Sequence, residues 1–251
     1  MNTEITEILT SQSYIKADGA KFTFTSSIDI IEARFLAGIL QQTKPLRTIE
    51  IGCAEGASSI VIMDNLKSGA THTIVDPFQT TYWESKGLNL LKKFGLSNYR
   101  LIEKGSEIAL PELLAKNERF DFAFIDGYHT FDHTLLDAFY LSRMLNIGGI
   151  LVIDDVQMPA INKCMRYLYN YPHLEFYGAS ETAPVTGKRK LLDGMKQVTG
   201  FFGGVLPRKM RYELFDGSVI TANKKMGLRS TMAAFRKTAE DTREWNWWEP
   251  F

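Results

Sequence analysis

Two apolar stretches that each end in acidic residues constrain the fold more than any other feature of this chain. The first is FDFAFID at 120–126 and the second is IGGILVIDD at 147–155. Apolar runs of this length, bounded by glycine and polar residues, are typical of strands buried on both faces of a parallel sheet. Such sheets bind ligands at the carboxyl ends of their strands. We therefore expect Asp126, Asp154 and Asp155 to meet in one crevice, where a cation or a polar ligand offsets their repulsion.

Strand-like and helix-like patterns alternate between about residues 28 and 178, which indicates an α/β fold with a parallel sheet. The predicted strands are 47–52, 71–76, 99–103, 120–126, 148–154 and 174–178, with a last strand at 199–206. The predicted helices are 28–42, 57–68, 84–95, 106–117, 132–145 and 158–170. The polar segment 179–199 is expected to be a loop beside the crevice.

Composition excludes several classes of protein. The two cysteines, Cys53 and Cys164, are far apart and match neither a disulfide framework nor a zinc motif. The N-terminus lacks the features of a signal peptide, and no apolar run approaches the length of a membrane span, so we expect a cytoplasmic protein. Net charge is zero, yet residues 1–185 hold 16 Lys and Arg against 22 Asp and Glu, whereas residues 186–251 hold 13 against 7. The basic part either attracts an acidic partner or is a solvated face.

The segment 47–59 combines a strand, a turn of small residues and the start of a helix. Gly52 and Gly56 allow a ligand to approach backbone N–H groups at the helix N-terminus, although a tight turn alone also occurs for purely structural reasons. Asp76 ends the next strand, 20 positions after Gly56, where an acid can bind a ribose diol. Nicotinamide-dependent dehydrogenases share this spacing, so it indicates ribose rather than one cofactor.

Four motifs together resemble the class I S-adenosylmethionine-dependent methyltransferases. They are EIGCAEGASS at 50–59, VDPFQ at 75–79, FIDGYHTFDH at 124–133 and GGILVIDD at 148–155. The resemblance is to the small-molecule O-methyltransferases, including magnesium-using enzymes that tailor sugars and macrolides. It implies a Rossmann-like, doubly wound, mostly parallel seven-stranded sheet with helices on both faces, and S-adenosylmethionine as cofactor. Ala54 departs from the pattern, because many methyltransferases have glycine there.

The resemblance also implies roles for individual residues. Glu50 would approach the methionine amino group, Asp76 the ribose and Ser106 the adenine. The full set of implied cofactor-binding residues is Glu50, Gly52, Ala54, Gly56, Ser58, Asp76, Pro77, Phe78, Ser106 and Asp126.

Magnesium would be held by Asp126, Asp154 and Asp155, and His129 would be the general base, with Asp126 also at the catalytic centre. Alternatives remain at these positions. The Asp154–Asp155 pair can cap a turn without metal, and His129 can fix its loop by a hydrogen bond. The spacing of His129 and His133 permits zinc, but the glutamate of a metalloprotease helix is missing.

The chain divides into an N-terminal helical extension (1–45), a cofactor-binding core (46–180) and a C-terminal part (181–251) with a basic region and a Trp-rich tail. The two additions are expected to shape the substrate side. The tail, with Trp245, Trp247 and Trp248, is expected to pack on the domain or to form a homo-oligomer. We expect a small polar acceptor, no membrane association and no nucleic-acid partner. The alternatives are a metal-independent methyltransferase, a nicotinamide-dependent dehydrogenase and a catalytically silent relative.

Overall fold

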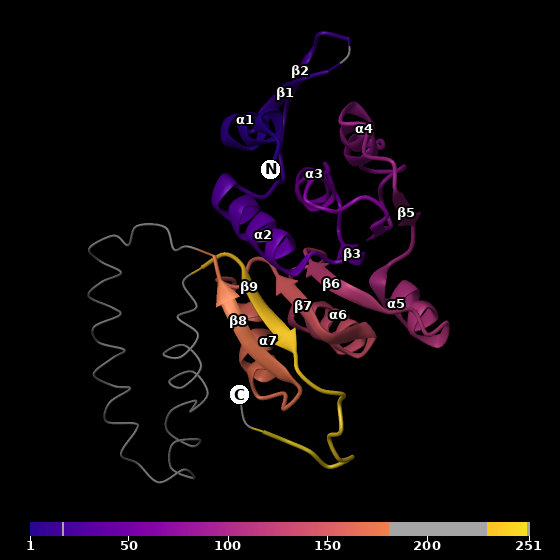
Figure 1. The fold of residues 1–251 in the computed structure, drawn as a ribbon, viewed down its shortest axis with the longest axis vertical. Coiled ribbons are helices and arrows are strands. Elements are labelled where there is room, and N and C mark those ends of the chain that lie inside the picture. The colour runs from indigo at the N-terminus through magenta and orange to yellow at the C-terminus, as the bar shows by residue number, and fades with distance from the viewer. Residues whose placement is uncertain (17, 181–229, 250–251) are drawn as a thin grey trace, which may run out of the picture.

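A seven-stranded sheet forms the centre of the molecule in the computed structural model, which describes residues 1–16, 18–180 and 230–249 (Figure 1). The strands of this sheet are β3 (Arg47–Ile51), β4 (Thr71–Val75), β5 (Tyr99–Ile102), β6 (Phe120–Ile125), β7 (Leu145–Ile153), β8 (Leu174–Ala179) and β9 (Ala233–Lys237). Their order across the sheet is β5-β4-β3-β6-β7-β9-β8. Strands β3 to β7 pair in parallel, and β9 runs antiparallel between β7 and β8.

This topology confirms the predicted fold class, including the number of strands. The seventh strand, however, is β9 at 233–237, a segment that we placed in the C-terminal tail. It was missed because AAFRK is a short run with one apolar side chain larger than alanine, and it follows a long basic segment. The predicted strand at 199–206 lies outside the described residues.

Helices cover both faces of the sheet, as predicted. They are α1 (Thr3–Ser11), α2 (Ile30–Thr43), α3 (Ala57–Asp64), α4 (Lys86–Lys93), α5 (Ser106–Ala115), α6 (Phe131–Met144) and α7 (Pro159–Tyr169). Helices α1 to α4 lie on one face and α5 to α7 on the other (Figure 1). All six predicted helices are present, and their ends differ from the prediction by a few residues, because a helix frays where capping decides its last turn.

Alternation of side chains along the central strands explains why both faces are buried. In β6, Phe122 and Phe124 contribute to the core beneath α2 and α3, whereas Ala123 and Ile125 contribute to the core beneath α5 to α7. All four side chains are 0–3% exposed. Successive strand residues point to opposite faces, so a strand covered on both sides must be apolar throughout. The acid that ends the run is therefore the first polar side chain to leave the core.

The N-terminal extension contains a feature that the sequence did not predict. Between α1 and α2, the hairpin formed by β1 (Ser13–Ile15) and β2 (Lys21–Thr23) pairs antiparallel. It is held by contacts among the rings of Tyr14, Phe22 and Phe24. Three-residue strands leave too short a period to recognise in sequence. Helix α2 begins at a capping box in which Asp29 and Glu32 bond each other's backbone N–H.

The C-terminal tail packs against the domain through one of its tryptophans. Trp247 contacts the rings of Tyr167 and Tyr171, whereas Trp245 and Trp248 are 95% and 67% exposed. This confirms the predicted packing role for one residue of the aromatic cluster. Among the described residues, none of the helices has the length and apolar character needed to cross a membrane.

Candidate functional site

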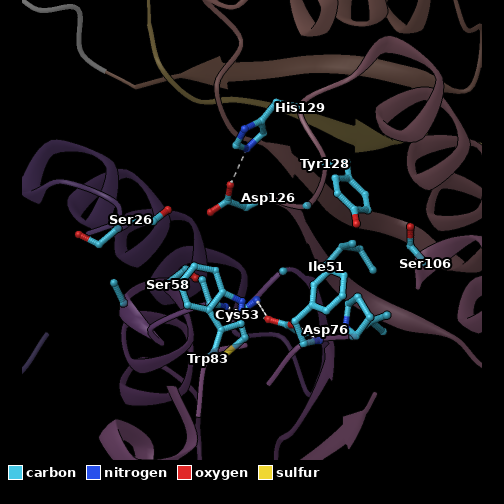
Figure 2. Close-up of a pocket in the computed structure, with 18 of the residues that line it drawn as sticks. Ser26, Ile51, Cys53, Ser58, Asp76, Trp83, Ser106, Asp126, Tyr128 and His129 are labelled. Carbon is cyan, nitrogen blue, oxygen red and sulfur yellow. Dashed lines mark hydrogen bonds and ion pairs between the residues drawn. The ribbon is translucent and has the colours of Figure 1, made fainter. Parts of the chain in front are cut away.

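A cavity of about 250 Å³ opens at the carboxyl ends of β3, β4 and β6 (Figure 2). Its lining includes most of the predicted cofactor-binding residues, together with His129. They are Gly52, Ala54, Ser58, Asp76, Pro77, Phe78, Ser106 and Asp126. Two of the predicted residues, Glu50 and Gly56, do not line it. The structure thus brings together residues of three of the four motifs, and Ser106, although up to 77 positions separate them in the chain.

The turn after β3 depends on two glycines that hold backbone conformations unfavourable for other residues. Gly52 has φ +86°, and a Cβ atom there would lie 2.0 Å from the carbonyl oxygen of Asp126. Gly56 has φ +87°, and a Cβ atom there would lie 2.7 Å from the Cα of Gly87 in α4. Close approach of neighbouring backbone therefore requires glycine at both positions. Gly56 does not line the cavity, but it allows the turn to pack closely against α4.

The Asp76 carboxylate fixes the conformation of this turn by hydrogen bonds. Its Oδ2 accepts hydrogen bonds from the backbone N–H of Cys53 and Ala54, at 3.0 and 2.9 Å, and from Nε2 of Gln79 at 3.0 Å. Its Oδ1 accepts the N–H of Phe78 at 2.8 Å. A carboxylate oxygen accepts more than one hydrogen bond, so Oδ1 keeps capacity for a further donor on the cavity side. The predicted ribose contact remains a prediction that this geometry permits.

Glu50 lies beneath the turn rather than in the cavity. Its Oε2 accepts a hydrogen bond from the Ser59 hydroxyl and lies 3.2 Å from Nε2 of His72. The other ring nitrogen of His72 lies 2.8 Å from the Thr48 hydroxyl. Glu50 and His72 are both fully buried. Glu50 therefore orders the turn, and the predicted approach to a methionine amino group remains a prediction.

Ser106 begins α5 on the far side of the cavity. Ser106 forms a hydrogen bond with Asp137 of α6, which is 1% exposed. Burial raises the pKa of Asp137 to about 6. The aromatic side chains of Phe78, Trp83 and Tyr128 add apolar surface to the same cavity. Trp83 and Tyr128 were not assigned to the site from sequence, although both stand close to motif residues. Aromatic surface beside a polar pocket suits a planar heterocycle.

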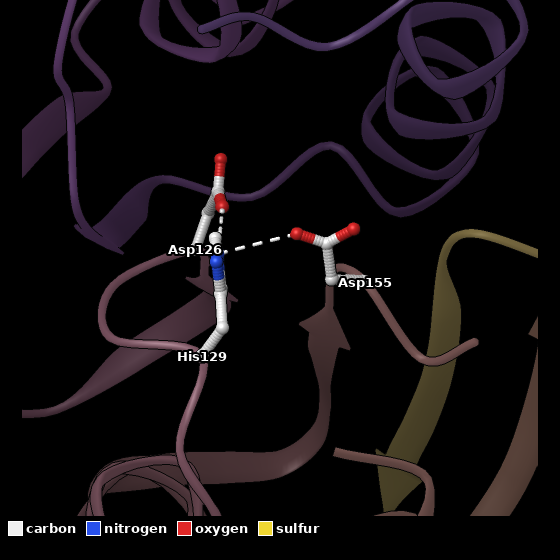
Figure 3. A group of neighbouring side chains, drawn as sticks. All are labelled: Asp126, His129 and Asp155. Atoms are coloured by element: carbon white, nitrogen blue, oxygen red, sulfur yellow. Dashed lines mark hydrogen bonds and ion pairs between the residues drawn. The ribbon is translucent and has the colours of Figure 1, made fainter. Parts of the chain in front are cut away.

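Asp126, His129 and Asp155 form a compact group at the edge of the cavity (Figure 3). Nε2 of His129 lies 3.3 Å from Oδ1 of Asp126 and 3.2 Å from Oδ2 of Asp155. One ligand atom from each residue lies within 4.8 Å of the other two. Asp155 has φ +54°, a left-handed conformation that aspartate tolerates better than most residues. The predicted convergence of acids is confirmed for Asp126 and Asp155, with His129 between them.

Asp154 belongs to the same acidic region but lies deeper. Its Oδ1 accepts the N–H of Asp155 at 2.8 Å, and the residue is 8% exposed. Burial, followed by the charges of Asp126 and Glu32, raises the pKa of Asp154 well above its ordinary value. Glu32 comes from α2, and its pKa is also raised by burial. Asp154 lies outside the Asp126–His129–Asp155 group, so its role as a metal ligand remains a prediction.

The pKa values of Asp126 and His129 reflect burial and their contact with each other. Burial raises the pKa of Asp126 to about 6, against a partial compensation by His129. The hydrogen bond to Asp126 raises the pKa of His129 above its ordinary value. His133, the other member of the histidine pair, lies 2.9 Å from the Thr130 hydroxyl instead. Carboxylates crowded in this way favour a bound cation, and the donor atoms present are of kinds that divalent ions accept.

Three residues of the N-terminal extension also line the cavity, and sequence reasoning missed them. Ser26, Ser27 and Ile28 lie between the hairpin and α2. Ser26 lies on the side of the cavity away from Ser106 (Figure 2). No motif marks this segment, and only the fold brings it next to residues 51–58, so no sequence signal could have identified it.

Comparison with known proteins identifies the family. Residues 49–156 match the family model described as a methyltransferase domain. The chain is 32% identical over 162 residues to an uncharacterised protein of Acanthamoeba polyphaga mimivirus, covering 60% of this chain and 72% of that one. It is 29% identical over 136 residues to a caffeoyl-CoA O-methyltransferase of Populus kitakamiensis, covering 51% and 54%. The chain thus spans about half the length of that second relative.

A solved structure shows the same fold at low sequence identity. An O-methyltransferase from Streptomyces achromogenes, crystallised with S-adenosylmethionine, has a TM-score of 0.58 and 14% identity, covering 73% of this chain and 85% of that one. The family match favours a methyltransferase over the dehydrogenase that would share the first turn. The chain therefore carries a methyltransferase domain at 49–156, with the fold of S-adenosylmethionine-dependent methyltransferases and a partial likeness to the caffeoyl-CoA O-methyltransferases.

Proposed function

We propose that this protein transfers a methyl group from S-adenosylmethionine to a hydroxyl of a small polar molecule, with a divalent cation, of which magnesium is our first choice, beside the reacting oxygen. The observation that carries the proposal is the position of Asp126, His129 and Asp155 at the edge of a cavity lined by the cofactor motifs. Family membership supports the cofactor. The named activities of the relatives support oxygen as the acceptor atom.

The cofactor would lie along the turn after β3. Asp76 holds two N–H groups of this turn, and Gly52 lets the turn approach β6, so a ligand meets backbone at short range. Ser106 and Phe78 would lie beside the adenine, at the end of the cavity formed by α5 and β4. A preformed wall of this kind lowers the entropy lost when the cofactor is positioned for reaction.

S-Adenosylmethionine supplies an electrophilic methyl group, and a divalent cation lowers the pKa of a hydroxyl that it binds. Asp126 and Asp155 would hold the cation. The third protein ligand is either Asp154, which completes an all-oxygen set suited to magnesium, or His129, which lies closer to both carboxylates. In the first case the cation would take up the charge of Asp126 and Asp155, which would leave Nε2 of His129 unprotonated and able to accept the hydroxyl proton.

Titration calorimetry with S-adenosylhomocysteine tests the cofactor site, run in magnesium and again in chelator. We expect saturable binding at one site. Absence of binding would contradict the methyltransferase assignment, whereas binding without any effect of magnesium, even with hydroxyl acceptors present, would leave a metal-independent enzyme.

The His129→Ala variant separates the two ligand sets. If His129 is the base, the variant keeps cation affinity and loses turnover. If His129 is a ligand, both fall together. Full turnover in this variant would remove His129 from the chemistry.

A further inference from the structure

Glu55 is a buried carboxylate beside the cavity. It lies within the motif at 50–59, but neither the implied cofactor contacts nor the proposed chemistry give it a role. It is 2% exposed and stands between Ala54, which lines the cavity, and Gly56, which precedes α3. A carboxylate removed from water requires hydrogen bonds or a counter-charge. Its bonding partners therefore indicate why this position is acidic.

The hydrogen bonds that the described residues give to Glu55 all come from a segment 29 or 30 positions earlier. Oε2 accepts the backbone N–H of Thr25 at 2.7 Å and that of Ser26 at 3.2 Å. Oε1 accepts the Thr25 hydroxyl at 2.9 Å. Three donors on two consecutive residues fix both the position and the orientation of that segment.

The same segment is held on its other side by Gln12, at the end of α1. The Ser27 hydroxyl donates to Oε1 of Gln12, and Nε2 of Gln12 donates to the carbonyl of Ile28 at 3.2 Å. Ser26, Ser27 and Ile28 line the cavity. The segment therefore crosses from the hairpin to α2 as a wall of the cavity, and Glu55 is its attachment to the cofactor-binding turn.

We propose that Glu55 is a positioning residue for cofactor binding, which holds residues 25–28 in place as one wall of the cofactor cavity. The inference rests on the proposed function, because it takes the ligand of this cavity to be S-adenosylmethionine. It makes cofactor affinity depend on the N-terminal extension, which the methyltransferase-domain match at 49–156 does not include. Two carboxylates then fix the turn after β3. Asp76 accepts hydrogen bonds from the turn, and Glu55, within the turn, accepts hydrogen bonds from the N-terminal extension.

The test measures the affinity of S-adenosylhomocysteine by calorimetry in Glu55→Ala and Glu55→Gln. Alanine removes every acceptor, and we expect a dissociation constant raised at least about tenfold. Glutamine keeps one carbonyl oxygen for the two N–H groups, and its amide can donate to the Thr25 hydroxyl, so it should restore most of the affinity.

Asp121→Ala is the matched control. Oδ2 of Asp121 also accepts two consecutive backbone N–H groups, those of Leu46 and Arg47, each at 3.0 Å. Asp121 lies at the opposite end of β6 from the cavity. We expect this variant to lose stability and keep its affinity. Wild-type affinity in Glu55→Ala, or an equal loss in Asp121→Ala, would overturn the proposal.

Hydrogen exchange on the wild-type protein supplies a readout that does not require a folded Glu55→Ala. S-Adenosylhomocysteine should slow exchange of the amides of residues 25–28, and Thr25→Val should weaken binding about two- to threefold. Unchanged exchange in this segment on binding would overturn the proposal, as would wild-type affinity in Thr25→Val. If the wild-type protein binds no S-adenosylhomocysteine, the proposed function fails instead.

Discussion

Asp126 and Asp241 lie at opposite ends of the sheet in contrasting electrostatic environments. At the carboxyl ends of β6 and β7, burial raises the pKa of Asp126 to about 6, and the ion pairs found there among the described residues involve His129 alone. Beyond the end of β9, Asp241 lies 2.7 Å from nitrogens of both Arg143 and Arg243, and the hydrogen bond from Arg243 is the main cause that lowers its pKa to about 2.

This difference separates carboxylates that stabilise the fold from carboxylates that are available to bind a ligand. Arg243 also stacks on the rings of Tyr171 and Trp247, at 3.6 and 4.8 Å from their centroids, so the Asp241 cluster is complete within the chain. Among the described residues, the Asp126 region has no comparable positive charge. A protein keeps such an arrangement where a bound ion or a reacting group provides the compensation.

Asp126→Asn should have the largest effect on activity, because it removes both a candidate cation ligand and the hydrogen bond to His129. With an acceptor that the wild-type enzyme turns over, we expect methyl transfer to fall about 100-fold or more. Release of S-adenosylhomocysteine is the readout. Asp241→Asn should stay within about twofold of wild type, and an equal loss in the two variants would break the comparison.

Asp241→Asn should instead destabilise the fold, by about 2 kcal/mol at neutral pH. The lowered pKa means that the ionised form is preferred in the folded state. This stabilisation is fully present above the unfolded value of 3.8 and is lost as pH falls toward about 2. Urea unfolding measures the change. Asp18→Asn is the control, because Asp18 is 66% exposed and its pairing with Lys16 should contribute less than about 0.5 kcal/mol.

Trp247→Ala tests how much the aromatic contacts of the Asp241 cluster stabilise the fold, because it removes a ring that contacts Arg243 and α7. We expect a loss of about 1.5 kcal/mol in the free energy of unfolding. Trp245→Ala should change stability by less than about 0.5 kcal/mol, because the side chain is 95% exposed. Equal effects would contradict the packing described for the tail.

Asp126→Asn should also raise stability in chelator, by about 1 kcal/mol at pH 8. The raised pKa of Asp126 means that burial favours the protonated carboxyl. Relative to the variant, wild-type stability is therefore lost as pH rises from 3.8 through about 6, and the two proteins should converge below that range. Unfolding curves between pH 4 and pH 8 measure the difference, and a variant less stable than wild type at pH 8 would show that Asp126 is already compensated.

Much of the fold could be predicted from sequence because its central strands are covered on both faces. Six strands were found from apolar runs such as 120–126, and six helices from the helix-like patterns between them. The elements that were missed are short or follow no period. The hairpin depends on contacts among three aromatic rings, and β9 depends on partners 54 to 86 positions away.

The candidate site was predictable where chemistry lies in motifs. Asp76 and Asp126 were found because each ends a strand. Glu55 and Ser26 were missed, because the link between them joins two segments that only the folded chain brings together. The sequence also implied Asp154 as a ligand beside Asp155; Asp154 lies deeper, at 8% exposed, and its role as a ligand remains a prediction.

Binding of Mn²⁺ in the presence of S-adenosylhomocysteine, measured by electron paramagnetic resonance, tests the central claim most directly. The account predicts one bound ion per chain in the wild-type protein, loss of that ion in Asp155→Asn, and unchanged binding in Asp241→Asn. Absence of bound ion in the wild-type protein at millimolar Mn²⁺, or equal binding in Asp155→Asn, would contradict the claim that these acids form a cation site.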